Sequence, residues 1–166
     1  MALLVICVIP AGFIMMNLPS GPAQDRFFDL HRSIGFLILC LAVVRVAVRI
    51  LVPPPGRPDG LPLIQWRVAE AVHYALYVLI LVMPVLGWLT SSAYGATVNV
   101  FGLFSLPNLV GKDEALSDLL GDWHQRLGIL MTALLLLHMG AGLWHGIVQR
   151  DGVLSRMLPG LSRKAG

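Results

Sequence analysis

Charged residues are scarce in this 166-residue sequence: Asp, Glu, Lys and Arg together make up 13% of it, whereas hydrophobic residues make up 57%. With a mean hydropathy of +0.78, the composition lies well outside the range of an ordinary soluble domain. It predicts an integral membrane protein. The net charge of +3 and the pI near 9.2 then reflect how Lys and Arg are distributed around the membrane, and we expect no nucleic-acid partner.

The sequence is also poor in the groups that build disulfides and metal clusters. It has only two cysteines, Cys7 and Cys40, each inside an apolar run where we expect a small buried hydrophobic side chain. A zinc site needs four close ligands, often Cys or carboxylate, and the sequence shows no such cluster. No internal repeat and no low-complexity segment is visible in it.

Four apolar runs are long enough to cross ~30 Å of hydrocarbon at ~1.5 Å per helical residue. They lie at about 1–18, 33–52, 68–91 and 124–148. The predicted fold class is therefore all-α: an integral membrane four-helix bundle, with one transmembrane domain over 1–166. The first run has no basic leader, and its flank PSGPAQD has no small-x-small cleavage site, so we expect a retained span rather than a signal peptide.

The two sides of the predicted bundle differ in their basic residues. One side has eight Lys and Arg residues, in the segment RVAVRILVPPPGRPDG that ends the second run, at the start of the third run and in the tail. The other side has four: Arg26, Arg32, Lys112 and Arg126. Because basic residues stay on the cytoplasmic side, both termini are predicted to be cytoplasmic. The segment 92–123 is then a long outer loop, in which FGLFSLPNLV is apolar enough for the membrane interface and KDEALSDLLGD is a candidate short amphipathic helix.

All five histidines lie in or beside a predicted span: His31, His73, His124, His138 and His145. Ionisable residues inside a bilayer are costly and usually face the interior of a bundle, so each one is a candidate site residue. For any single histidine, a hydrogen bond to a neighbouring helix is an equally good interpretation.

His124 and His138 are the most informative pair. Fourteen helical residues at ~100° each return nearly to the starting face and rise ~21 Å, so one helix face offers two imidazoles at two depths. This geometry suits two haem irons, each held by a neutral imidazole nitrogen. Because His31 and His124 both mark the outer ends of their helices, we predict that they face each other across an outer haem.

Three arginines accompany these histidines. Arg32 and Arg126 lie close to the outer pair and are predicted to meet haem propionates, with snorkelling to the interface as the alternative. Arg45 lies fourteen residues after His31 on the same helix face, at about the depth of His138. A buried arginine needs an anion, and a propionate of the inner haem is a natural one.

Taken in order, these segments resemble the bacterial cytochrome b561 family, which are small four-helix di-haem membrane proteins. The matching segments cover nearly the whole chain: LHRSIGFLILCLAVVRVAVR followed by PPP, then HYALYVLILVMPVLGW, WHQRLGILMTALLLLHMGAGLWH and VLSRMLP. The resemblance implies that His31 and His124 hold the outer haem b and that His138 holds the inner one. It also implies a multi-pass protein of the bacterial inner membrane, with electron transfer between a periplasmic-side donor and a quinone. At least one member is described as oxidising superoxide and reducing ubiquinone, which would make this chain a quinone-linked oxidoreductase.

One position departs from the family pattern. In the family, the partner of the deep fourth-helix histidine belongs to a His-Trp pair just before the first apolar run, whereas this chain begins at Met1, inside that run. We expect that the start codon is assigned too late, because the first span reaches only ~27 Å. Two alternatives stay open: His73 substitutes as the second inner ligand, or the chain binds a single haem.

His73 and His145 are predicted to lie toward the inner leaflet. An imidazole there can hydrogen-bond a quinone carbonyl and pass a proton, or can partner a propionate. The expected partners are a membrane quinone, a small anionic or protein donor at the periplasmic face, and the lipid bilayer. Two other functions stay open: a haem b anchor subunit of a periplasmic dehydrogenase or hydrogenase, and a haem-free membrane scaffold or transporter.

Overall fold

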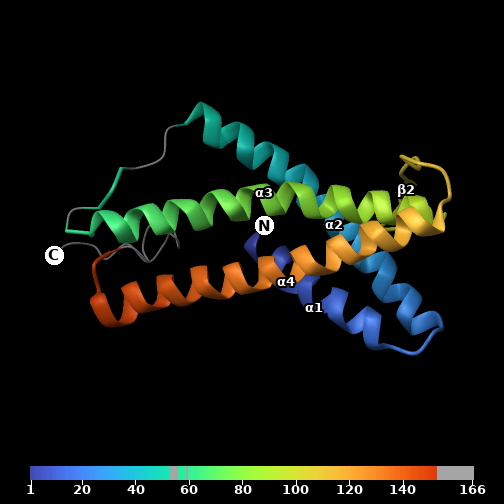
Figure 1. Ribbon diagram of the computed structural model, residues 1–166, viewed down its shortest axis with the longest axis horizontal. Coiled ribbons are helices and arrows are strands. Elements are labelled where there is room, and N and C mark those ends of the chain that lie inside the picture. The colour runs from blue at the N-terminus through green and yellow to red at the C-terminus, as the bar shows by residue number, and fades with distance from the viewer. Residues whose placement is uncertain (53–55, 59, 153–166) are drawn as a thin grey trace. The chain divides into compact units, whose positions relative to one another are not determined.

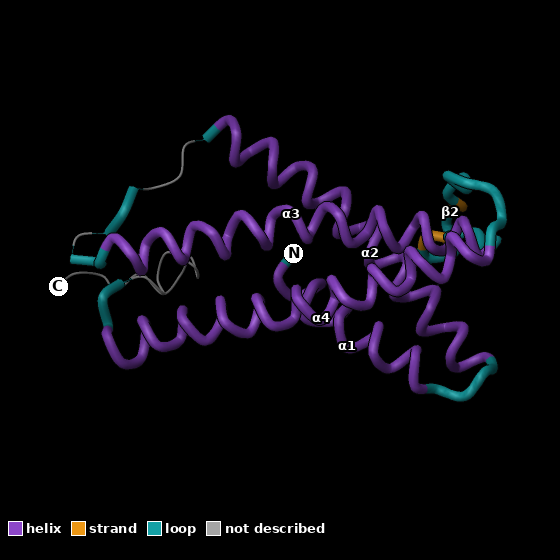
Figure 2. The backbone as a smooth tube through the Cα atoms, viewed as in Figure 1, coloured by secondary structure: helices purple, strands orange, loops and turns teal. Residues whose placement is uncertain are grey.

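The computed structural model (Figures 1 and 2) describes residues 1–52, 56–58 and 60–152, which form four α-helices and one small hairpin. The helices are α1 (Ala2–Asn17), α2 (Pro22–Leu51), α3 (Leu63–Tyr94) and α4 (Glu114–Trp144), and α4 continues into a short π-helical segment, η1 (His145–Gln149). Strands β1 (Asn99–Val100) and β2 (Phe104–Ser105) pair antiparallel between α3 and α4. The predicted helical fold class is thus confirmed.

Within the described part of the chain, three helices are long and apolar enough to cross a membrane: α2, α3 and the 36 residues of α4 with η1. This agrees with the prediction of an integral membrane protein. Helix α1 is also apolar and continues through Pro10, but its 16 residues rise only ~24 Å, less than the ~30 Å of a hydrocarbon core. A fourth span at 1–18 therefore stays a prediction, as does the cytoplasmic position of both termini.

The three longer helices begin earlier than the predicted spans at 33–52, 68–91 and 124–148. Hydropathy marks only the apolar part of a helix, whereas the backbone hydrogen bonds continue into the polar flanks. Pro22 opens α2, where a missing N–H costs no helical hydrogen bond, and Asp113 caps α4 by accepting a hydrogen bond from the Leu116 N–H. The segment KDEALSDLLGD therefore falls mostly within the start of α4, and the outer loop is shorter than the predicted 92–123.

The described residues gather into two compact units, and α3 and α4 each contribute to both. Among the described residues, the first unit takes 1–52 and 77–130, and the second takes 56–58, 60–76 and 131–152. In the first unit, α1 packs against α2, and α2 also contacts β1. The single domain over 1–166 stays a prediction.

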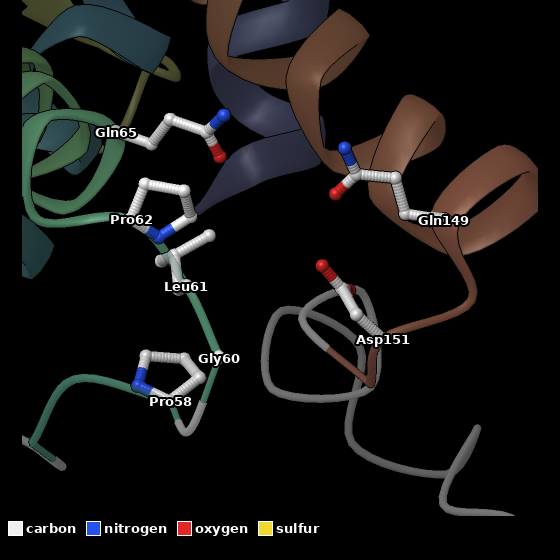
Figure 3. Close-up of a pocket in the computed structure, with 7 residues that line it drawn as sticks. All are labelled: Pro58, Gly60, Leu61, Pro62, Gln65, Gln149 and Asp151. Atoms are coloured by element: carbon white, nitrogen blue, oxygen red, sulfur yellow. The ribbon is translucent and has the colours of Figure 1, made fainter.

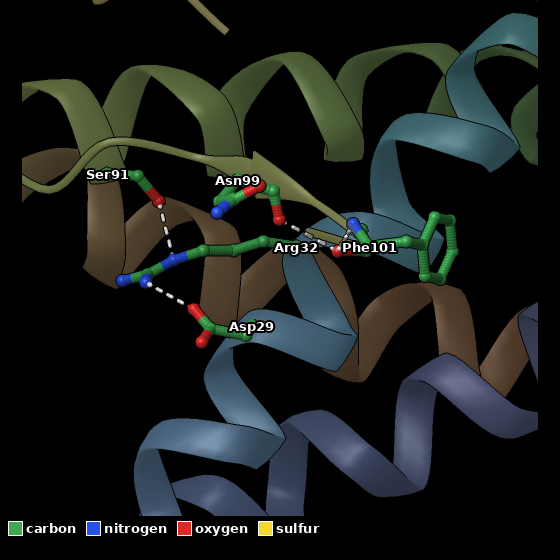
Figure 4. Close-up of polar contacts among 6 residues, drawn as sticks. Asp29, Arg32, Ser91, Asn99 and Phe101 are labelled. Carbon is green, nitrogen blue, oxygen red and sulfur yellow. Dashed lines mark hydrogen bonds and ion pairs between the residues drawn. The ribbon is translucent and has the colours of Figure 1, made fainter. Parts of the chain in front are cut away.

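Ser33 fixes the hairpin to α2 in the first unit. Its side chain is 2% exposed, donates a hydrogen bond to the Asn99 carbonyl (3.2 Å) and accepts one from the Phe101 N–H (3.0 Å) (Figure 4). Phe101 has a φ of 51°, a left-handed conformation that is strained for a bulky side chain. A small hydrophobic core supports the hairpin: Val98, Val100, Leu106, Phe36 and Trp88.

Replacing Ser33 with alanine is expected to lower the free energy of unfolding by about 1–2 kcal/mol, because two backbone groups lose their hydrogen-bond partner. Thermal unfolding of the purified protein in detergent measures this change. Ser105→Ala is the matched control, since it removes an exposed hydroxyl from β2 of the same hairpin. If both variants unfolded at the same temperature as the unchanged protein, Ser33 would not anchor the hairpin.

Candidate functional site

His31 of α2 and His124 of α4 are neighbours in the first unit. Their ring centroids lie 6.0 Å apart and their planes are inclined by 76°. An imidazole nitrogen binds a transition metal at about 2.0–2.1 Å, so two rings on opposite sides of one metal have centroids roughly 6 Å apart. The structure therefore brings together the two histidines that the sequence pairs, at a separation that suits a metal ion between them.

The Nδ1 atom of each ring faces the backbone of a neighbouring helix. His31 Nδ1 lies 3.0 Å from the Val8 carbonyl oxygen of α1, and when Nδ1 donates to this oxygen, Nε2 keeps the lone pair that a metal needs. His124 Nδ1 is buried and, among the described residues, has no partner in hydrogen-bond geometry, although the Met83 carbonyl of α3 faces it. Metal-bound histidines commonly use a backbone carbonyl in this way.

Both rings also lie against a glycine of the neighbouring helix. A Cβ built on Gly12 would be 3.0 Å from Cε1 of His31, and a Cβ built on Gly87 would be 3.1 Å from Cε1 of His124. Both distances are far shorter than an ordinary van der Waals contact. No spacing in the sequence marks these two glycines, because only the packing of the helices places a histidine against each of them.

Arg32, the residue after His31, is held by three neighbouring side chains. Its Nε donates a hydrogen bond to Ser91 Oγ of α3 (3.2 Å), and its Nη1 lies 3.8 Å from Asp29 Oδ1 (Figure 4). The guanidinium carbon lies 5.1 Å from the centre of the Phe28 ring, a cation–π contact. Because the side chain is 21% exposed, its positive charge is only partly in solvent.

The other two predicted arginines lie in different settings. Arg126 is 69% exposed and pairs with Asp122 one turn earlier on α4, at 2.9 Å. The guanidinium of Arg45 lies 5.7 Å from the centre of the Tyr77 ring, and the side chain is exposed on the described protein. The burial expected for Arg45 is therefore not found, because the packing of α2 leaves this side chain at the protein surface.

His73 of α3 and His138 of α4 are neighbours in the second unit. Their ring centroids lie 5.1 Å apart and their planes are inclined by 75°. This separation is shorter than the roughly 6 Å expected for two rings on one metal, so a shared metal would require one side chain to rotate. His138 thus lies beside His73, the residue predicted from the sequence as the alternative second ligand of the inner haem.

His145 opens η1 at the end of α4, and its Nδ1 lies 2.6 Å from Asp151 Oδ2. Asp151 also lines a cavity of about 300 Å³. Figure 3 shows its carboxylate and the amide groups of Gln65 and Gln149 turned toward this space. Short π-helical segments are frequent at functional sites. Nothing in the sequence pattern marks Asp151 as a partner of His145.

No group of three or more His, Cys, Asp or Glu side chains is placed to hold a metal ion in the part of the chain that the structure describes. The thiols of Cys7 and Cys40 are free, and both residues are exposed, not buried as expected, because the described helices do not cover them. The two histidine pairs are therefore the candidate metal-binding groups among the described residues.

Comparison with known proteins identifies relatives of this chain. The family model described as prokaryotic cytochrome b561 matches residues 1–160. Cytochrome b561 homolog 2 of Escherichia coli (strain K12) is 35% identical over 130 residues, which cover 78% of this chain and 69% of that protein. Probable superoxide oxidase CybB of Yersinia pestis is 30% identical over 131 residues, covering 78% and 73%. Cytochrome b561 homolog 1 of Escherichia coli (strain K12) is 26% identical over 137 residues, covering 79% and 74%.

Proposed function

Since the chain belongs to the prokaryotic cytochrome b561 family, we propose that it passes electrons between a donor at the periplasmic face of the bacterial inner membrane and a quinone in the membrane. Family membership makes it a membrane haem b electron-transfer protein and argues against a haem-free scaffold or transporter. Haem supplies the one-electron chemistry when it is bound. The side chains supply the ligands, the orientation and the local charge.

The observation that carries this proposal is the pairing of His31 with His124. With their ring centroids 6.0 Å apart, these two imidazoles would be able to hold one haem iron together. The contact of His31 Nδ1 with the Val8 carbonyl orients the ring and raises the basicity of its other nitrogen. We assign these two histidines to the outer haem b.

For the inner haem we propose His138 as one ligand. His73 is the histidine whose ring contacts that of His138 among the described residues, so we propose it as the second ligand. The alternative is that the 166-residue chain binds a single haem. The two possibilities differ in the number of haems that the 166-residue chain binds.

Arginines near the two histidine pairs are proposed to meet the haem propionates. Arg32 is the best placed, because Ser91 and Asp29 hold its guanidinium beside His31 and an arginine fork suits a carboxylate. Arg126 and Arg45 are proposed for the same role. The exposure of both on the described protein leaves their guanidinium groups accessible to such an anion.

The quinone is proposed to bind near the inner end of α4. His145 presents an imidazole there, fixed by Asp151, and the cavity beside it carries the amides of Gln65 and Gln149 (Figure 3). These groups offer hydrogen bonds to the two carbonyl oxygens of a quinone headgroup, and the His145–Asp151 pair is able to pass a proton when the quinone is reduced.

Replacing His145 with alanine is expected to raise the KM for quinone by about three- to tenfold, the value of one lost hydrogen bond. The haem b spectrum should stay unchanged, because His145 is not an iron ligand in this proposal. Steady-state quinone reduction by the purified protein measures the KM. Val148→Ala is the matched control, since it shortens an exposed side chain of the same η1 segment. An unchanged KM in His145→Ala would place the quinone elsewhere.

Superoxide is the proposed donor, because a relative that is 30% identical is named a probable superoxide oxidase and Arg32 offers a partly exposed positive charge to a small anion. The alternative is a protein donor, as in an anchor subunit of a dehydrogenase or hydrogenase. Purified chain supplied with enzymatically generated superoxide and a soluble quinone should reduce the quinone, and added superoxide dismutase should stop the reaction. Activity only with a co-purified partner would favour the anchor subunit.

A further inference from the structure

The glycine at position 12 leaves room for the His31 ring to pack against α1. A helical carbonyl points toward the residue four positions later, so the side chain of that residue flanks the carbonyl oxygen. His31 Nδ1 lies 3.0 Å from the Val8 oxygen. Cε1 of the same ring packs against Gly12, and a Cβ atom built on this glycine would lie only 3.0 Å from Cε1. A Cβ at this position would require the ring to shift by a few tenths of an ångström relative to the carbonyl.

The His124 ring packs against α3 in the same arrangement. The Met83 carbonyl faces Nδ1 of His124, and Gly87, four residues later, lies against the same ring. A Cβ on Gly87 would be 3.1 Å from Cε1 of His124. Helices α1 and α3 thus share one pattern, a carbonyl followed four residues later by a glycine. In each helix, both groups face the same histidine of the outer pair.

We propose that Gly12 and Gly87 are positioning residues that hold the imidazoles of His31 and His124 against backbone carbonyls and thereby fix their steeply inclined planes, at 76° to each other. This inference rests on the proposed ligation of the outer haem by these two histidines. Neither glycine touches the iron itself. Each acts through the ring that packs on it.

The contacts of the two imidazole rings with these carbonyls and glycines control two measurable properties of the outer haem. A hydrogen bond from Nδ1 to a carbonyl makes Nε2 more basic, and a more basic ligand favours ferric over ferrous iron, which lowers the midpoint potential. The angle between the ring planes sets how far the two iron d orbitals that interact with the rings differ in energy. Nearly perpendicular rings leave these orbitals close in energy, which gives a strongly anisotropic low-spin ferric signal in electron paramagnetic resonance. Parallel rings give a rhombic signal instead.

Gly12→Ala and Gly87→Ala test the inference in the haem-loaded protein. Each added methyl group should displace its ring by a few tenths of an ångström. We expect both variants to show a shifted low-field g value. Gly12→Ala should also raise the midpoint potential of the outer haem, because it moves the His31 ring against the Val8 carbonyl, which its Nδ1 contacts at 3.0 Å. Gly121→Ala is the matched control, because its Cβ would meet only Thr90 of α3 at an ordinary 3.7 Å, and its g values and potential should match those of the unchanged protein.

The outcomes separate this inference from the function on which it rests. If His31→Ala left the haem content unchanged, the proposed ligation itself would fail. If that ligation held but Gly12→Ala and Gly87→Ala behaved like Gly121→Ala, only the role of the glycines would fail. A rhombic signal from the outer haem of the unchanged protein would also overturn it, and this measurement does not depend on any variant folding. Selective loss of the outer haem in an alanine variant, with the inner haem retained, would support it.

Discussion

Replacing His31 with alanine is expected to remove the outer haem while the chain still inserts into the membrane. The rings of His31 and His124 lie with their centroids 6.0 Å apart, and both would be needed to hold the haem, so removal of one imidazole should release it. Membranes that contain this variant should lose roughly half of the haem b absorbance in a reduced-minus-oxidised spectrum if two haems are bound.

His124→Ala should give the same loss, because both histidines hold one iron. Gln125→Ala is the matched control, since it truncates the exposed side chain next to His124 on α4 and should leave the spectrum unchanged. Full haem b absorbance in both histidine variants would refute the pairing.

The second large effect concerns the inner haem. The 166-residue chain is expected to bind two haems, and both His138→Ala and His73→Ala are expected to reduce this number to one, because their rings are in contact in the structure. The haem-to-protein ratio of each purified variant, from the pyridine haemochrome and the protein mass, measures the change. Tyr74→Phe is a control on the neighbouring exposed position of α3.

Each ratio has a definite meaning for the inner site. One haem in the unchanged 166-residue chain, with no further loss in His73→Ala, would show that this chain holds a single haem and that His73 is not an iron ligand. Two haems that persist in His73→Ala would show that His73 is not a ligand. Two haems that persist in His138→Ala would remove the inner site from α4 altogether.

Much of the fold could be predicted because hydropathy and histidine spacing are properties of one helix at a time. A run of about twenty apolar residues predicts a helix wherever it packs. The pairing of His31 with His124 needed only that both histidines lie near the starts of helices that begin on the same side of the bundle. The structure places these rings side by side, and it also shows His138 in contact with His73.

The parts that could not be predicted depend on contacts between elements. The polar starts of α2 and α4 carry no hydropathy signal, and the two-residue strands of the hairpin are too short for an alternating pattern. The close contacts at Gly12 and Gly87 form only because a histidine of another helix packs against each glycine. Arg45 was expected to be buried because it lies in an apolar run, but its exposure depends on which face of α2 the other helices cover.

The most direct test of the central claim is the absorption spectrum of the purified 166-residue chain, recorded with a quinol as the only reductant and then with dithionite. The account predicts a haem b α-band that quinol already produces in part and dithionite completes, and that is reduced in His31→Ala. A chain present in the membrane that shows no haem b α-band even with dithionite would contradict it.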